Sequence, residues 1–241
     1  MVNGIKPAHY ENMAKAITKF VIGEYDKLVS EEPASEIYSD MKINVFSNKS
    51  NKILFLGYNS NDTSLIKILE GRGYEVIHSD NAICFESYHL AISFGYRHIL
   101  SIETIRSLGC PIINLHMSFL PYNKGAHPIF WAFYDENKCG VAIHELNEGI
   151  DTGPIMFRKK VAIDDRKSTF LEAHQRLKLE IEKMFIENID EILGLRWQAV
   201  EQSEKGTIHK KSELPGGFLG WDTIIYEEIR RLKLSEDFTI A

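Results

Sequence analysis

Short apolar runs alternate with longer amphipathic stretches through the middle of this chain. Because buried parallel strands are almost continuously apolar and their connecting helices are amphipathic, the alternation predicts an α/β fold with an open, mostly parallel twisted sheet. The expected strands are 53–57, 74–78, 90–95 and 111–116, with helices at 62–70 and 101–108. Ligands of such sheets bind outside the carboxyl ends of the strands.

The pattern changes after residue 116. Pro128 suits the first turn of a helix that runs to about Asp135. A capping box formed by Thr169 and Glu172 predicts the start of a long helix that continues to about 193. Further strands are expected at 141–144 and 155–163, and segments 197–202 and 206–209 predict a β-hairpin.

These patterns divide the chain into three parts. Residues 1–50 are expected to form an N-terminal helical extension, with an amphipathic helix over 10–30 and a strand over 42–46. Residues 51–194 form the predicted catalytic α/β domain, and 195–241 a small C-terminal hairpin region.

Composition and charge exclude several classes of protein. The 241 residues are 44% hydrophobic and 26% charged, which is typical of a soluble globular protein. A net charge of -6 argues against a nucleic-acid partner. No apolar run approaches the ~18 residues of a membrane span, and no signal-peptide pattern is present, so we expect a cytoplasmic protein without a membrane partner.

Polar side chains gather at the end of the strand 111–116. Asn114 and His116 are two residues apart, so they project from the same face of that strand. An amide suits donation to an oxygen that becomes negative, and an imidazole suits proton transfer. Asp151, in a glycine-flanked loop, is the carboxylate expected to orient the imidazole and favour its protonated form. With no nucleophile-elbow sequence present, direct transfer fits better than an acyl-enzyme.

Structural interpretations compete with these. Asn114 and His116 could serve only local hydrogen bonds, and Asp151 could be an Asx-turn residue. His127 is interpreted as capping or preceding the helix at Pro128, and His144 as an outward-facing strand residue. The chain has no His-x-His, His-x-x-x-His or His-Glu-x-x-His spacing, so we predict no metal site.

Two spaced motifs resemble the signature of the folate-dependent formyltransferases. They are Asn-x-His-x-Ser-x-Leu-Pro at 114–121, followed by Gly125-Ala126, and His-Glu-x-x-Glu-Gly-x-Asp-Thr-Gly at 144–153. The resemblance covers residues 52–163. It implies a Rossmann-like fold, a 10-formyltetrahydrofolate donor and an amine acceptor, and it makes Asn114, His116 and Asp151 the catalytic residues.

A third segment, 93–100, resembles the part of that family that lines the pterin pocket, largely through backbone groups. The donor contacts that this resemblance implies are Phe94, Tyr96, Arg97, His98, Ile99 and Leu100, together with Glu148 and Gly149.

Segments 121–131, 206–209 and 220–223 resemble the nucleotide-sugar N-formyltransferases. That branch formylates an amino group on a dTDP-linked dideoxy sugar for bacterial surface polysaccharide such as the O-antigen of lipopolysaccharide. The resemblance implies a nucleotide-sugar acceptor and a homodimer built through the expected hairpin at 197–209.

Four residues are expected to contact the acceptor. Ser60 follows the first strand, where helix N–H groups often hold phosphate. Lys124 supplies a local positive charge beside Gly125, and Trp221 is a candidate for stacking on the base.

In the mechanism we expect, the neutral amine attacks the formyl carbon. Asn114 and protonated His116 stabilise the oxyanion, and Asp151 supports the imidazolium while a proton moves to the departing folate nitrogen. Alternative functions are transfer to glycinamide ribonucleotide or initiator Met-tRNA, hydrolysis of the donor, and non-catalytic binding of folate or nucleotide.

Overall fold

The computed structural model describes residues 50–81 and 83–237. The chain divides into two compact units, Met1–Phe46 and Ser47–Ala241. The helix and strand expected at 10–30 and 42–46 lie outside the described residues. The region 195–237 belongs to the same unit as the α/β domain.

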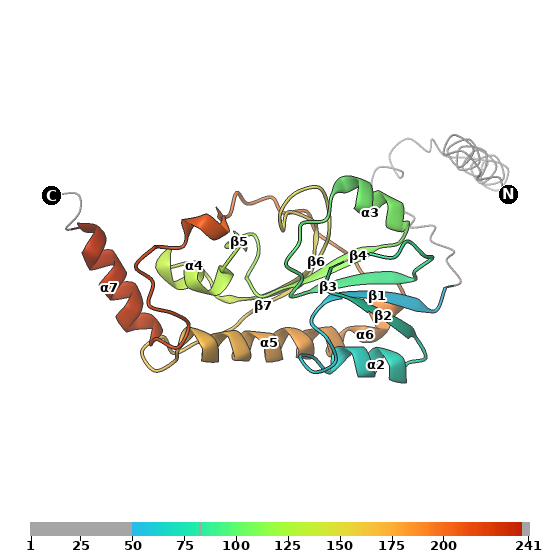
Figure 1. Ribbon diagram of the computed structural model, residues 1–241, viewed down its shortest axis with the longest axis horizontal. Coiled ribbons are helices and arrows are strands. Elements are labelled where there is room, and N and C mark those ends of the chain that lie inside the picture. The colour runs from blue at the N-terminus through green and yellow to red at the C-terminus, as the bar shows by residue number, and fades with distance from the viewer. Residues whose placement is uncertain (1–49, 82, 238–241) are drawn as a thin grey trace, which may run out of the picture. The chain divides into compact units, whose positions relative to one another are not determined.

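A six-stranded sheet forms the centre of the larger unit, in the order β2-β1-β3-β4-β6-β7 (Figure 1). The strands β1 to β4 pair in parallel, whereas β6 pairs antiparallel with β4 and with β7. The predicted α/β fold with a mostly parallel sheet is therefore confirmed. The strand bounds are Lys52–Gly57 (β1), Glu75–Ser79 (β2), Leu90–Phe94 (β3), Ile112–His116 (β4), Gly140–Glu145 (β6) and Ile155–Lys160 (β7).

Helices flank this sheet on both faces. Figure 1 shows α2, α5 and α6 along one face and α3 on the other. The capping box of Thr169 and Glu172 starts α5 as predicted, but the expected long helix is divided at Asn188 into α5 and α6. The helix bounds are Leu65–Gly71 (α2), Ile102–Leu108 (α3), Pro128–Tyr134 (α4), Phe170–Glu187 (α5), Ile189–Leu193 (α6) and Ile225–Asp237 (α7), with a 3-10 turn, η1, at Lys211–Glu213.

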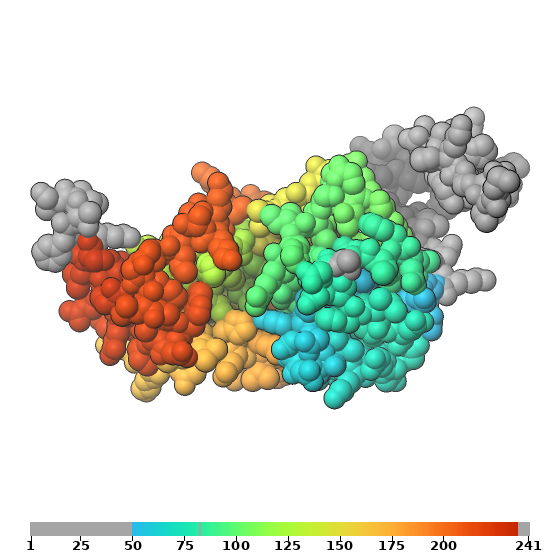
Figure 2. Space-filling view, viewed as in Figure 1, coloured from blue at the N-terminus to red at the C-terminus, as the bar shows by residue number. Residues whose placement is uncertain are grey.

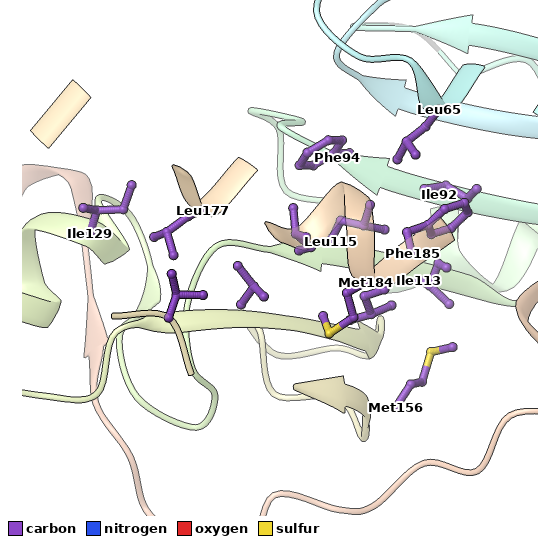
Figure 3. Packing of buried hydrophobic residues seen from close by; sticks show 14 of the residues in the cluster. Leu65, Ile92, Phe94, Ile113, Leu115, Ile129, Met156, Leu177, Met184 and Phe185 are labelled. Carbon is purple, nitrogen blue, oxygen red and sulfur yellow. The ribbon is translucent and has the colours of Figure 1, made fainter. Parts of the chain in front are cut away.

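The main core lies between α5 and the sheet (Figure 3). Leu177, Ile181 and Phe185 are buried on α5, and their spacing of four residues keeps them on one side of the helix. They belong to the same cluster as Ile113 and Leu115 of β4. The packing therefore fixes β4, which carries two of the predicted catalytic residues at its carboxyl end.

The hairpin predicted at 197–209 is wrong. Val200 instead forms an antiparallel bridge with Ile155 at the start of β7. The strand β8 (Ile208–His209) pairs in parallel with β5 (Lys124–Gly125). Gly125 permits that close approach, since a Cβ there would lie 2.3 Å from the carbonyl oxygen of His209. The two halves have strand-like sequences, but each pairs with a distant segment.

We predict that Phe130→Ala lowers the free energy of unfolding by about 3–5 kcal/mol, because it leaves a cavity among aromatic rings. Phe130 is fully buried, and its ring contacts those of Phe170 and Phe218, which join α4 to α5 and to the C-terminal region. Urea unfolding measures the change. The matched control is Phe85→Ala, at a ring that is 63% exposed, which should shift stability by less than about 0.5 kcal/mol. Equal losses in the two variants would contradict the packing described.

Candidate active site

The end of β4 places Asn114 and His116 beside neighbouring strands. Asn114 pairs with Ser93 of β3 and with His144 of β6. His116, two residues further on, is 9% exposed. The carboxyl end of β4 thus lies where the sheet changes from parallel to antiparallel pairing.

The Asp151 carboxylate connects these side chains. Its Oδ2 accepts the backbone N–H of Gly125 at 2.8 Å, and its Oδ1 accepts Asn114 Nδ2 at 3.1 Å. His116 Nε2 lies 3.7 Å from Oδ2, and His144 Nε2 lies 3.5 Å from Oδ1. The three residues predicted to be catalytic therefore meet around one carboxylate.

Sequence reasoning misplaced His144. The ring is fully buried rather than outward-facing, and Nδ1 donates to the carbonyl oxygen of Glu145 at 2.8 Å. That hydrogen bond places a proton on Nδ1, and Nε2 lies 3.2 Å from Asn114 Nδ2. His144 is therefore a fourth member of the cluster. The signal for it was its place in the second motif, directly before Glu145.

The neighbours of Asp151 oppose the effect of burial. Burial alone would raise the pKa of Asp151, but the His116 and His144 imidazoles and the Gly125 N–H together hold it well below its usual range. Asp151 is therefore ionised at neutral pH.

Burial lowers the pKa of His116 below its usual 6.5, with Asp151 acting in the opposite direction and His144 in the same one. A pKa below 6.5 favours the neutral imidazole at neutral pH in the protein without substrates. Nε2 carries a proton, because it faces two acceptors: the Asp151 carboxylate and, at 3.4 Å, the carbonyl oxygen of Asn123.

The segment expected to hold the pterin follows β3. Phe94 is buried in the core, whereas Arg97, His98 and Ile99 are exposed. Among the described residues, no backbone hydrogen bond engages the N–H or carbonyl groups of residues 96–100. These groups suit a flat ligand with donors and acceptors on its edge.

The other expected donor contacts surround this segment. Tyr96 donates its hydroxyl proton to the carbonyl oxygen of Asn81 at 2.9 Å. Leu100 packs against the smaller core cluster beneath α3. Glu148 forms an exposed ion pair with Arg106 at 3.3 Å. The backbone N–H of Gly149 donates a hydrogen bond to Asn147 Oδ1.

The expected acceptor contacts are dispersed. Ser60 is exposed in the turn before α2, and Lys124 on β5 is 8% exposed. Gly125 uses its N–H for Asp151. Trp221 is 39% exposed and packs against the ring of His127, whose side chain makes no capping hydrogen bond to α4.

Figure 2 shows the surface hollowed between the orange C-terminal region and the green segment around α3.

No group of three or more His, Cys, Asp and Glu side chains in 50–81 and 83–237 is arranged to hold a metal ion. No helix in the same ranges is long and apolar enough to cross a membrane.

Known proteins resemble much of this chain. The dTDP-4-amino-4,6-dideoxyglucose formyltransferase of Mycobacterium bovis is 29% identical over 157 residues, which cover 65% of this chain and 60% of that relative. The methionyl-tRNA formyltransferase of Thermodesulfovibrio yellowstonii is 36% identical over 103 residues, or 42% of this chain and 33% of the relative. The chain thus spans less than two thirds of the length of these relatives.

One similar crystal structure is that of the formyltransferase PseJ from Anoxybacillus kamchatkensis, solved with UDP-4,6-dideoxy-4-formamido-L-AltNAc and tetrahydrofolate. It is 32% identical, with a TM-score of 0.66, and the match covers 73% of this chain and 96% of PseJ. The family model described as formyl transferase matches residues 43–189, which contain all of the cluster around Asp151. The chain therefore belongs to the formyl transferase family.

Proposed function

We propose that this protein is an N-formyltransferase that moves a formyl group from 10-formyltetrahydrofolate to the amino group of a nucleotide-linked amino-dideoxy sugar. The observation that carries the proposal is the convergence of Asn114, His116 and His144 on the ionised Asp151 at the carboxyl end of β4. Such a cluster combines a proton acceptor with hydrogen-bond donors, which formyl transfer to an amine requires.

The relatives support the class of acceptor. The mycobacterial relative is named for a 4-amino-4,6-dideoxy sugar on dTDP, and PseJ was solved with a 4-formamido-4,6-dideoxy sugar on UDP. Both names put the nitrogen at position 4, so we propose a 4-amino group as the acceptor. We retain dTDP as the predicted nucleotide, and we propose a role in the synthesis of bacterial surface polysaccharide.

In the proposed reaction, 10-formyltetrahydrofolate supplies the formyl group as donor substrate. Neutral His116 accepts the proton that the attacking amine loses, and the Asp151 carboxylate stabilises the resulting imidazolium. Asn114 offers an amide proton to the formyl oxygen as negative charge develops there. His116 then returns its proton to the departing folate nitrogen.

Binding roles are assigned by position. The unengaged backbone of 96–100, with Phe94, Glu148 and Gly149, is proposed to hold the pterin of the donor. Lys124 and Ser60 are proposed to contact the acceptor phosphates, and Trp221 the base. Gly125 serves the site through the N–H that it donates to Asp151.

We further propose that the protein is cytoplasmic and homodimeric, with small-molecule partners only. The net charge of -6 supports the exclusion of a tRNA acceptor. The loss of the expected hairpin leaves the dimer without an assigned interface, and light scattering of the purified protein tests the assembly.

The direct test of the proposed function is mass spectrometry of the protein incubated with 10-formyltetrahydrofolate and a panel of acceptors. The panel contains dTDP- and UDP-linked 3-amino and 4-amino sugars, glycinamide ribonucleotide and initiator Met-tRNA. We expect an added formyl group on a 4-amino nucleotide sugar. Formylation of the ribonucleotide or the tRNA alone, formate release that needs no acceptor, or ligand binding with no product would each replace this function with the corresponding alternative.

Substitution of the cluster tests the proposed roles. Asn114→Ala, His116→Ala and Asp151→Asn should each lower kcat by roughly 100- to 1,000-fold, because each removes a donor, a proton acceptor or the charge that orients it. The control is Asp190→Asn, at an exposed carboxylate paired with Arg72 on the surface, which should leave kcat unchanged. Circular dichroism verifies folding. Wild-type turnover by His116→Ala would refute the assignment.

The protonation state of His116 provides a pH-dependent test. Burial lowers the pKa of this imidazole and Asp151 partly restores it, so removing the carboxylate charge should lower the pKa further. NMR titration of nitrogen-labelled histidine should therefore give an apparent pKa below 6.5 for the wild-type protein and a still lower value for Asp151→Asn. A wild-type value above 7, or an upward shift in the variant, would contradict the proposed proton acceptor.

A further inference from the structure

Residues 200–209, which we call the C-terminal strap, lie outside the part of the chain matched by the family model. Both ends of the strap are fixed by backbone hydrogen bonds. At one end Val200 and Ile155 exchange hydrogen bonds of 2.8 and 2.9 Å, and at the other β8 pairs with β5. The strap therefore spans two segments that carry functional groups: the loop that holds Asp151 and the strand that holds Gly125.

Gln202, a residue of the strap, forms hydrogen bonds with the loop that contains Asp151. Its Nε2 donates to the carbonyl oxygen of Asp151 at 2.9 Å and to that of Gly153 at 2.8 Å. Both partners can only accept, so the amide nitrogen must face them. Asp151 has a φ of +51°, a conformation that costs free energy for a residue with a side chain. The two hydrogen bonds from Gln202 offset that cost and fix the direction of the carboxylate.

Thr207 holds the residue that faces His116. Its Oγ1 accepts the Asn123 N–H at 2.7 Å and donates to Asn123 Oδ1 at 3.2 Å. Asn123 is fully buried, has a φ of +55°, and presents its carbonyl oxygen to His116 Nε2. Thr207 thus stabilises an unfavourable backbone conformation that orients the imidazole.

The pairing of β8 with β5 also orients the Gly125 N–H. The backbone N–H of Lys124 donates to the carbonyl oxygen of Thr207 at 3.0 Å, and the backbone N–H of Ala126 donates to the carbonyl oxygen of His209 at 2.9 Å. Because successive N–H groups of a strand point in opposite directions, the Gly125 N–H points away from β8. It is the N–H that Asp151 Oδ2 accepts.

We propose that the C-terminal strap is a positioning element of the active site, and that Gln202 and Thr207 are its positioning residues, acting through Asp151 and His116 respectively. The inference rests on the proposed function for its kinetic consequences, but the geometry it describes is independent of the substrate. In place of the expected hairpin, the C-terminal strap sets the direction of two catalytic side chains.

The kinetic test uses Gln202→Met, which keeps the length of the side chain and removes both donors. We expect kcat to fall on the order of 100-fold, because a small displacement of a catalytic group has a large effect on rate. The same substitution in an Asp151→Asn background should have almost no further effect, since the group it positions has lost its charge. Gln198→Met, at an exposed glutamine just before the strap, is the matched control and should retain wild-type kcat.

A second readout needs no turnover. NMR titration of His116 in Gln202→Met should give an apparent pKa below that of the wild-type protein, since the carboxylate that raises it is displaced; Gln198→Met should not shift it. Thr207→Val, which removes only the hydroxyl group, is the second variant and should lower kcat and alter the His116 titration.

These outcomes separate the two proposals. If no acceptor in the panel is formylated by the wild-type protein, the proposed function fails, while a shifted His116 titration still supports the strap. If Gln202→Met and Thr207→Val fold, turn over as the wild type does and leave the His116 titration unchanged, the strap has no positioning role. Fully additive losses of Gln202→Met and Asp151→Asn would likewise overturn it.

Discussion

A carboxylate that leaves water for a protein interior keeps its charge only if hydrogen-bond donors or nearby positive charges replace the lost hydration. Asp151 meets this condition through contributions from three parts of the chain: the amide of Asn114 on β4, the imidazoles of β4 and β6, and the backbone N–H of Gly125 on β5. Each of these groups stabilises the charge only if it points toward the carboxylate. The positions of β4, β5, β6 and the 147–154 loop are therefore coupled through one side chain.

The reversal of strand direction between β4 and β6 makes this arrangement possible. In an antiparallel pair, Asn114 lies opposite His144, so their side chains meet at the end of the strand that also carries His116. The chain then returns through a loop tight enough that a Cβ on Gly153 would lie 1.8 Å from the carbonyl oxygen of Glu145. That loop carries Asp151 back over the end of β4, where the strap restrains it.

Much of the fold could be predicted from local pattern. The apolar runs of β1, β3 and β4 and the capping box at Thr169 are determined by neighbouring residues, and the structure has them within a residue or two of the expected positions. The spacing of Asn114 and His116 placed both at one strand end. His144 was missed because β6 is buried on both faces, so no alternation distinguishes inward from outward positions.

The strap was mispredicted for a different reason. Residues 197–209 have strand-like composition and a polar turn, but strand pairing depends on which partner is close in space, and the sequence does not show that Val200 meets Ile155 or that β8 meets β5. The role of Gln202 has no local signature at all, since an amide that bonds two backbone carbonyls resembles any polar surface residue. Positive φ values at Asp151 and Asn123 are likewise consequences of tertiary contacts.

The ionisation of Asp151 is the central claim, and isotope-edited infrared difference spectroscopy measures it directly. The wild-type protein and Asp151→Asn, both with labelled aspartate, are compared as the pH falls from 7 to about 4, near the ordinary pKa of aspartate. The account predicts that the Asp151 signal remains that of a carboxylate throughout this range. A protonated-carboxyl band that belongs to Asp151 and appears anywhere in this range would contradict it.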